Sequence, residues 1–285
     1  MTIAVTFLPR TGPAPLPPVA FIGGGNMASA IIGGLIQQGT PADAFEVVEP
    51  FDEARAKLAQ SFGIVAKAEA GEALSRCGVV VWAVKPQTFA EAARPVRAFA
   101  ADALHLSVAA GIPSDSIARW LGTERVVRAM PNTPALVGKG MTGLFARPGV
   151  ESADRSTVGQ LLAPTGELLW VDTEPALDAV TAMSGSGPAY VFYFIEAMAE
   201  AGTEMGLTPE QALRLAIGTF TGASALAHSA TEPPSVLRER VTSKGGTTYA
   251  AITSMQAADV KSQFKTAIRA AQKRAAELGE EFGRG

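Results

Sequence analysis

The stretch VAFIGGGNMASAI, residues 19–31, decides the fold. Its first four residues form an apolar run typical of a buried strand, and a helical pattern follows. Between them stand Gly23, Gly25 and Ala28, a spacing that allows a tight turn, close approach to a pyrophosphate, and close helix–strand packing. The stretch therefore predicts a dinucleotide site of the Rossmann type, with the pyrophosphate at the helix N-terminus. A strand–turn–helix with glycines for packing alone is the alternative.

Apolar runs alternate with helical patterns from Val19 to about Val171. The runs are continuous in their apolar residues, as is typical of strands buried on both faces. Strands that alternate with helices indicate an α/β domain, so we expect a parallel, doubly wound sheet over residues 19–172. The expected strands span residues 19–22, 45–48, 79–84, 104–108, 125–130, 143–145 and 167–171.

The sequence after residue 172 contains helical patterns only, which predicts a second, all-helical domain over residues 173–285. One helix start is well defined, because Thr208 can cap it, Pro209 suits the first helical position and Gln211 can complete a capping box. The expected helices span about 175–183, 187–206, 208–229, 234–242, 247–258 and 260–278.

Two glycines, Gly218 and Gly222, lie about one turn apart in the helix that begins near Thr208. Glycine inside a helix costs about 1 kcal/mol relative to alanine. This cost predicts close helix–helix contact, either within the chain or across a dimer.

The composition is that of a globular protein, with 47% hydrophobic and 18% charged residues in a chain of 285. A net charge of −3 gives no basic surface for nucleic acid, and the longest apolar run is too short to cross a bilayer. The single cysteine, Cys77, can form no internal disulfide and has no partner for a metal cluster. We therefore expect a cytoplasmic protein without a metal, a nucleic-acid partner or a membrane partner. Residues 1–18, rich in proline and without the features of a signal peptide, are expected to be a flexible leader.

A second glycine-rich stretch, VTSKGGTTYAAI at residues 241–252, also precedes a helical pattern. Gly245 and Gly246 allow the backbone to approach a ligand closely, and Ser243, Thr247 and Thr248 add hydroxyl groups. We expect the first loop to bind the pyrophosphate of the cofactor and this second loop to bind a substrate carboxylate. An ordinary helix cap is the alternative.

Glu49 ends the second expected strand, 24 residues after Gly25. A carboxylate at this place accepts hydrogen bonds from the ribose hydroxyls and repels a 2′-phosphate. Glu49 therefore favours NADH, with a solvated strand-end acid as the alternative, and Arg55 is the nearby cation.

The histidines and lysines do not suggest a base for alcohol oxidation. His105 lies within an expected buried strand and His228 ends an expected helix, so we expect both to be structural. Residues 178–207, which include the first long helix expected after the sheet, contain no lysine. Dehydrogenases that use a histidine or lysine base are therefore disfavoured.

Four stretches together resemble the Δ1-pyrroline-5-carboxylate reductases: AVKPQ (83–87), RAMPNTP (128–134), DAVTAMSGSGPAYVF (178–192) and VTSKGGTT (241–248). The resemblance covers the chain from Val19 to about Leu278. It implies reduction of the cyclic imine 1-pyrroline-5-carboxylate to L-proline by NADPH or NADH, the last step of proline biosynthesis. It also implies a helical domain that forms a homodimer, which in many relatives assembles further, commonly into decamers.

The resemblance also implies site residues. The second loop, including Thr248, matches the substrate-carboxylate loop of the family, and we expect the Thr248 hydroxyl to face the imine nitrogen and act in catalysis. The expected substrate-binding residues are Ser243, Gly245, Gly246, Thr247 and Thr248. The expected cofactor-binding residues are Gly23, Gly25, Asn26, Met27, Ala83, Lys85, Pro86, Met130, Pro131 and Asn132, with Glu49 from the strand-end argument.

The chain departs from the family pattern at two positions. Lys244 stands where many relatives have proline, and Glu49 replaces the polar or basic residues that suit NADPH. Two other functions stay open. One is a related reductase acting on a different imine or a 2-oxo acid, and the other is a non-catalytic dinucleotide-binding regulator.

Overall fold

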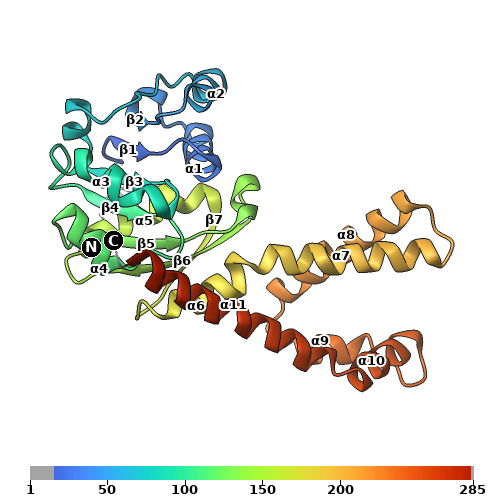
Figure 1. Ribbon diagram of the computed structural model, residues 1–285. Helices are drawn as coiled ribbons and strands as arrows, with labels where there is room; N and C mark the ends of the chain where they lie inside the picture. Colours follow the sequence, from blue (N-terminus) through green and yellow to red (C-terminus); the bar gives the residue numbers. More distant parts are fainter. Residues whose placement is uncertain (1–15, 284–285) are drawn as a thin grey trace, which may run out of the picture.

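The computed structural model describes residues 16–283, which form a sheet flanked by helices and a helical part that extends away from it (Figure 1). Residues 1–15 of the expected leader lie outside the described residues. The last three leader residues belong to the folded part: Leu16 packs against the core, and the Pro18 carbonyl accepts a hydrogen bond of 3.0 Å from the Gly78 N–H.

The sheet has seven strands in the order β2-β1-β3-β4-β5-β6-β7. The first five are parallel, whereas β6 runs antiparallel to β5 and parallel to β7. The doubly wound fold is confirmed, but the expectation of a wholly parallel sheet is wrong at β6, because a short loop without a crossover helix joins it to β5. The strands are β1 Val19–Ile22, β2 Phe45–Val48, β3 Val79–Trp82, β4 Leu104–Ser107, β5 Val126–Met130, β6 Gly140–Ala146 and β7 Gly166–Trp170.

Two apolar clusters form the core, one on each face of the sheet. Phe21 packs with residues of the helices α1 (Asn26–Gln37), α2 (Asp52–Phe62) and α5 (Ser152–Leu162) on one face. Trp82 packs with residues of α3 (Phe89–Arg97) and α4 (Ser114–Leu121) on the other. All four residues of β1 and of β3 are buried, which explains why their sequences are apolar without alternation.

The helical part begins after β7. Its capping box is confirmed, because the Thr208 side chain accepts a hydrogen bond from the Gln211 N–H and the Gln211 side chain accepts one from the Thr208 N–H. Where one helix was expected near residues 175–183, the structure has a short α-helix followed by a π-helical turn, Thr181–Gly185. The helices are α6 Ala176–Val180, α7 Gly187–Glu204, α8 Pro209–Ser229, α9 Pro234–Arg240, α10 Thr247–Ala257 and α11 Val260–Gly283.

Both ends of the helical part are attached to α4. At the first end, the Glu174 carboxylate accepts hydrogen bonds from the Ser114 N–H (2.6 Å) and hydroxyl (2.5 Å), and it pairs with Arg128 of β5 at 2.5 Å. At the other end, the Gly283 carbonyl accepts a hydrogen bond of 2.9 Å from the Ser116 hydroxyl. These two attachments fix the direction in which the helical part leaves the sheet (Figure 1).

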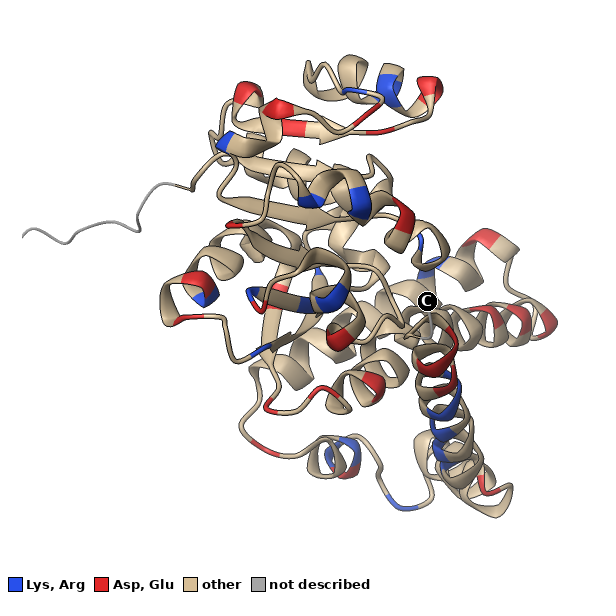
Figure 2. Cartoon of the chain, turned by 60° about the vertical axis from the view of Figure 1, so that its left-hand side comes forward, with Lys and Arg blue, Asp and Glu red and all other residues tan. Residues whose placement is uncertain are grey.

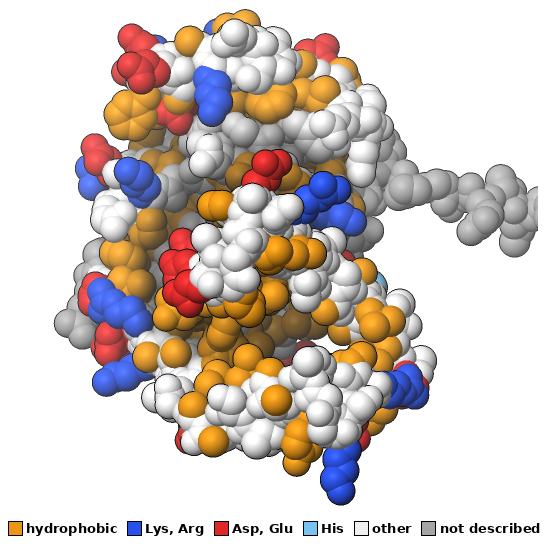
Figure 3. Space-filling view, turned by 90° about the vertical axis from the view of Figure 1, so that its right-hand side faces the viewer, with side chains coloured by type: hydrophobic (Ala, Val, Ile, Leu, Met, Phe, Trp, Pro, Cys, Tyr) orange, Lys and Arg blue, Asp and Glu red, His pale blue; other side chains and the backbone are white. Residues whose placement is uncertain are grey.

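The surface of the helical part is rich in exposed apolar side chains (Figure 3). The contact between α7 and α8 uses Gly202, whose added Cβ would lie 2.9 Å from the Cβ of Ala212. At Gly218 and Gly222 an added Cβ would meet nothing within 4 Å, so of the two expected kinds of contact, the one within the chain is excluded. A contact across a dimer stays a prediction for these two glycines. Exposed apolar residues of α7 and α8 include Val191, Phe192, Tyr193, Met198, Leu213, Leu215, Ile217 and Leu226.

Acidic and basic side chains are interspersed over both parts of the described chain (Figure 2). None of the helices within residues 16–283 combines the length and the apolar character that a membrane span requires.

His105 is a buried structural residue, as the sequence predicted. Its Nδ1 accepts a hydrogen bond of 3.0 Å from the Trp82 indole N–H, and its Nε2 lies 3.1 Å from the Ala100 carbonyl oxygen. Burial lowers the pKa of His105 from 6.5 to about 4.

This pKa makes the stability of the protein depend on pH. Below about pH 6.5 the unfolded chain takes up a proton at His105, whereas the folded chain stays neutral until about pH 4. Above pH 6.5 His105 therefore has no effect of this kind on stability. As the pH falls from 6.5 to 4, the free energy of unfolding decreases by about 3 kcal/mol. His105→Gln retains an acceptor and a donor but cannot be protonated, so urea unfolding should show a shallower loss of stability with falling pH. The exposed His228→Gln is the control; parallel losses in wild type and His105→Gln would contradict the assignment.

Candidate nucleotide and substrate site

The first glycine-rich loop has the geometry that its sequence predicts. Gly23 has a φ of +95°, and a Cβ there would lie 2.5 Å from the Ala83 carbonyl oxygen, so only glycine fits. At Gly25 an added Cβ would meet nothing within 4 Å, which leaves open space above the backbone. Gly25 is the N-cap of α1, and no side chain caps this helix end. Ala28 is fully buried where α1 packs on the sheet.

The position of this loop follows from the strand order. β1 lies between β2 and β3, so the order along the sheet reverses beside it, and ligands of open α/β sheets bind in the crevice at such a point. Ala83 directly follows β3, and its carbonyl oxygen lies beside Gly23 at the end of the neighbouring strand β1. Lys85 is exposed and Pro86 begins a short helical turn after it, so this segment forms one border of the crevice.

The two residues after Gly25 differ in exposure. Asn26 is the exposed first residue of α1, and Met27 is partly buried and packs against the core. The first backbone N–H groups of any helix have no partner within the helix. This loop therefore presents N–H groups and a positive helix end to an anion.

Glu49 lies beneath the loop, with 6% of its surface exposed. Its Oε2 accepts a hydrogen bond of 2.8 Å from the Gly24 N–H, and its Oε1 accepts one of 2.9 Å from the Phe51 N–H. Arg55 donates to the Glu49 carbonyl at 2.9 Å. The structure thus gives Glu49 a function that the sequence did not suggest: its carboxylate holds the glycine-rich loop against the end of β2.

Met130 ends β5, and Pro131 and Asn132 begin the loop that follows it. Pro131 is buried, and the side chain of Asn132 makes hydrogen bonds to β6 and to the π-helical turn Thr181–Gly185. The stretch that contains this turn carries part of the family resemblance, but no site residue was predicted within it. π-Helical turns are frequent at functional sites. The hydrogen bond from Asn132 to this turn joins residues distant in sequence, so the sequence pattern could not predict it.

The second glycine-rich loop resembles the first in one respect. Gly245 has a φ of +76°, and Gly246 is the N-cap of α10, where no side chain makes a capping hydrogen bond. The hydroxyls of Ser243, Thr247 and Thr248 therefore do not cap the helix, contrary to the alternative of an ordinary helix cap. Thr248, in the first turn of α10, is partly buried.

The two loops do not meet within one chain. α10 packs against α11, and Figure 1 shows both extending away from the sheet. α11 has 24 residues, a length of about 36 Å, and it spans the space between α10 and its attachment on α4. The predicted substrate residues 243–248 therefore lie apart from the predicted cofactor residues of the same chain.

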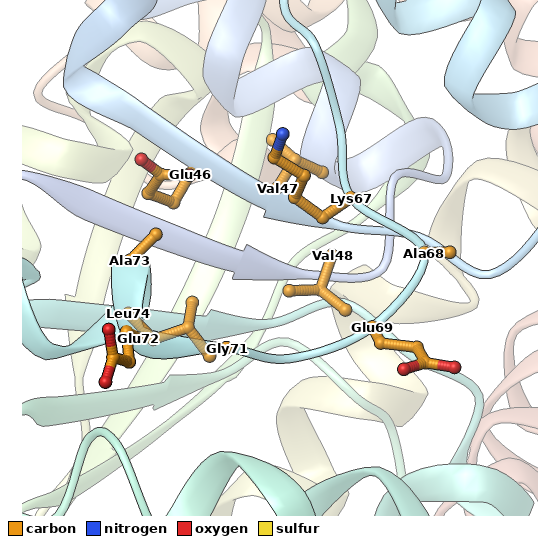
Figure 4. A pocket seen from close by; sticks show the side chains of 10 residues that line it. All are labelled: Glu46, Val47, Val48, Lys67, Ala68, Glu69, Gly71, Glu72, Ala73 and Leu74. Carbon is orange, nitrogen blue, oxygen red and sulfur yellow. The ribbon is translucent and has the colours of Figure 1, made fainter.

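A hollow of about 420 Å³ lies beside β2, lined by residues 46–48, 67–69 and 71–74 (Figure 4). Of its charged residues, Glu46, Glu69 and Glu72 are acidic and Lys67 is basic, so it does not favour a phosphate. No predicted site residue lines it.

The chain is similar to proteins of one family along nearly its whole length. A family model described as "Pyrroline-5-carboxylate reductase dimerisation" matches residues 174–278, and one described as "NADP oxidoreductase coenzyme F420-dependent" matches residues 18–111. A pyrroline-5-carboxylate reductase of Pseudomonas aeruginosa is 46% identical over 94% of this chain and 98% of that protein. One of Haemophilus influenzae is 41% identical over 91% and 97%. The chain belongs to the pyrroline-5-carboxylate reductase family.

Solved structures of this family have the same fold. A pyrroline-5-carboxylate reductase from Coxiella burnetii aligns with a TM-score of 0.87 at 34% identity, covering 93% of this chain and 99% of that one. One from Plasmodium falciparum, solved with NADP bound, aligns with a TM-score of 0.82 at 26% identity, covering 92% and 98%. In this family the first domain is a Rossmann-like sheet and the second is a helical dimerisation domain, as the chain has here.

The buried carboxylate of Glu49 leads to a prediction about the cofactor. Glu49→Ser removes one hydrogen bond to the loop, from the Gly24 N–H, and one from the Phe51 N–H. Each is worth about 1.5–3 kcal/mol when the acceptor is charged, and the change also removes a charge that repels a 2′-phosphate. We expect kcat/KM for NADH to fall at least about tenfold and the preference to move toward NADPH.

The exposed Glu53→Gln, which removes a nearby charge but no bond to the loop, is the control. Steady-state kinetics with both nucleotides measure the effect. If kcat/KM falls by the same factor for NADH and NADPH, Glu49 only supports the loop. A wild-type preference for NADPH of tenfold or more would refute the prediction that Glu49 at the end of β2 favours NADH.

Proposed function

We propose that this chain reduces 1-pyrroline-5-carboxylate to L-proline with NADPH or NADH, the last step of proline biosynthesis. The observation that carries the proposal is a pair of helix N-termini at which glycine is the N-cap and no side chain bonds to the helix start. Gly25 begins one of them at the crevice of the sheet, and Gly246 begins the other beside a cluster of hydroxyls. The first suits a pyrophosphate and the second a substrate carboxylate.

The chemistry requires little from side-chain bases. A reduced nicotinamide bound in the crevice would supply the hydride to the imine carbon, and the imine nitrogen receives one proton, through the Thr248 hydroxyl, to become the amine. Protonation makes the imine electrophilic, so alignment of the reactants and exclusion of water supply much of the remaining acceleration. His105 is buried and His228 is exposed at the end of α8, so neither is part of the proposed reaction.

The cofactor site that we propose lies in the domain of residues 19–172. The open space at Gly25 and the helix end of α1 fit a pyrophosphate, and Glu49 supports this loop and favours NADH. The other proposed cofactor-binding residues are Gly23, Asn26, Met27, Ala83, Lys85, Pro86, Met130 and Pro131. The resemblance places Asn132 among them, but both polar atoms of its side chain are bonded to the protein backbone.

The substrate site that we propose lies in the domain of residues 173–285. Backbone N–H groups at Gly246 and Thr247 bind the carboxylate, with Ser243 and Gly245 shaping the loop. The exposed Lys244 adds a positive charge to the same loop. The hydroxyl of Thr248 faces the imine nitrogen, because it can both donate and accept a hydrogen bond.

Two copies of the chain are needed to complete this site. The chain has a dimerisation domain, and within one copy the two loops are held apart by the length of α11. We propose that the substrate loop of one protomer meets the nucleotide crevice of its partner, with the exposed apolar face of α7 and α8 buried between them. Further assembly into a decamer, a cytoplasmic location and the absence of nucleic-acid and membrane partners complete the proposal.

Thr248 provides a direct test of the substrate loop. Thr248→Ala should lower kcat by about 100-fold, because the hydroxyl relays a proton to the nitrogen. Thr248→Ser should keep most of the activity, and Ser243→Ala should mainly raise KM for the imine. Steady-state kinetics, with nucleotide affinity measured separately, check these outcomes; a Thr248→Ala variant with wild-type kcat and KM would exclude this role.

Complementation tests the shared site. Gly25→Val blocks the nucleotide loop at a position with open space, so the fold should tolerate it, and Thr248→Ala damages the substrate loop. When the two variants are co-expressed with different tags and the heterodimer is purified, one of its two sites has both loops intact. We expect about half of the wild-type activity, far above either variant alone. A heterodimer as inactive as the single variants would show that each chain uses its own substrate loop.

A further inference from the structure

Asn132 joins three segments that are distant in sequence. Its Oδ1 accepts a hydrogen bond of 3.0 Å from the Met141 N–H, at the beginning of β6. Its Nδ2 donates one of 3.0 Å to the Ser184 carbonyl oxygen, within the π-helical turn Thr181–Gly185. The residue itself follows β5, so a single amide connects two strands of the sheet to the first turns of the helical part.

Apolar packing strengthens the same junction. A Cβ added to Gly185 would lie 2.5 Å from the terminal methyl group of Met130, so glycine at this position lets Met130 lie against the turn. Tyr190 donates a hydrogen bond of 3.1 Å to the Ala182 carbonyl oxygen. Two carbonyls of the turn therefore accept hydrogen bonds from side chains, one from Tyr190 on α7 and one from Asn132 in the other domain.

This junction lies at the edge where the nucleotide is expected. The carboxyl ends of parallel strands share one edge of the sheet, where Gly23 and Ala83 follow β1 and β3 and Met130 ends β5. The loop 130–132 is therefore part of the rim of the crevice, and the π-helical turn is fixed to that rim.

We propose that Asn132 is a positioning residue and not a ligand of the cofactor. Both of its polar side-chain atoms bond to the protein backbone, and through these bonds it sets where Met130 and the π-helical turn lie at the rim. The inference rests on the proposed function, because the position of the rim matters for aligning nicotinamide with the imine.

Isosteric and complementary variants test the proposal. Asn132→Asp keeps the acceptor for Met141 but sets a carboxylate oxygen against the Ser184 carbonyl. Tyr190→Phe removes the other side-chain bond to the turn without altering the sheet. We expect both variants to lower the single-turnover rate of hydride transfer by about 10- to 100-fold, the scale of loss that follows small misplacements of reactants. The dissociation constant of NADPH, from its fluorescence, should stay within about twofold of wild type.

The two variants should also be coupled. Because Asn132 and Tyr190 hold the same turn, the double variant should lose less than the product of the two single losses. Thr203→Val is the matched control, since its hydroxyl also bonds to a helix carbonyl, that of Ala199, but away from the turn; it should leave rate and affinity unchanged. Weaker NADPH binding by Asn132→Asp, in proportion to its loss of rate, would overturn the proposal and make Asn132 a cofactor ligand. Unchanged rates in both variants would also overturn it.

Hydrogen exchange of residues 181–190, measured without substrate, separates this inference from the proposed function. Faster exchange in Asn132→Asp supports the anchoring of the turn even if the wild-type protein fails to reduce pyrroline-5-carboxylate, a result that would refute only the proposed function. Exchange equal to that of wild type would overturn the anchoring.

Discussion

The arrangement of the sheet and the helical part depends on the bonds that the Glu174 carboxylate makes. It accepts hydrogen bonds from the first residue of α4 and pairs with Arg128, so the chain is held at the point where it leaves the sheet. Glu174 has a side-chain exposure of 23% and Arg128 of 12%, and removing one partner of such a pair leaves a poorly solvated charge. Because α11 returns to the same helix, the direction of the helical part is fixed at both ends. The distance between the two glycine-rich loops of one chain is a consequence.

Helix N-termini serve two purposes in this chain. At α4 the N–H of the first residue is bonded to Glu174, and the helix end is used to join the two parts. At α1 and α10 the N-cap is glycine, and no side chain bonds to the helix start. The same electrostatic preference for negative charge thus stabilises the fold at one helix and is available to ligands at the two others.

The parts of the fold that could be predicted are those with a local cause. Val79–Trp82 is buried on both faces, so its composition alone indicates a strand, and the capping box at Thr208 marks the start of α8. The direction of β6 carries no such signal, because the apolar pattern of a strand is the same in both orientations.

The candidate site was predictable where glycine geometry decides it, as at Gly23 and Gly25. It was not predictable where an interaction joins distant residues. The spacing that singled out Glu49 does not reveal that its carboxylate binds the Gly24 N–H. The π-helical turn accepts side-chain hydrogen bonds from Asn132 and Tyr190, and no local pattern encodes the first of these. Likewise, no local pattern indicates that the space around Gly218 is open within the chain.

The return of α11 to α4 also has a consequence for synthesis. Ser116 bonds to a carbonyl 167 residues later in the chain, and Phe282 packs against the apolar cluster beneath α4. At ribosomal rates of about 5–20 residues per second, α4 would be made roughly 10–30 s before Phe282. During that interval the apolar surface that Phe282 later covers is exposed to other nascent chains. The time between the emergence of α4 and that of α11 is therefore the period in which chaperones would have most to do.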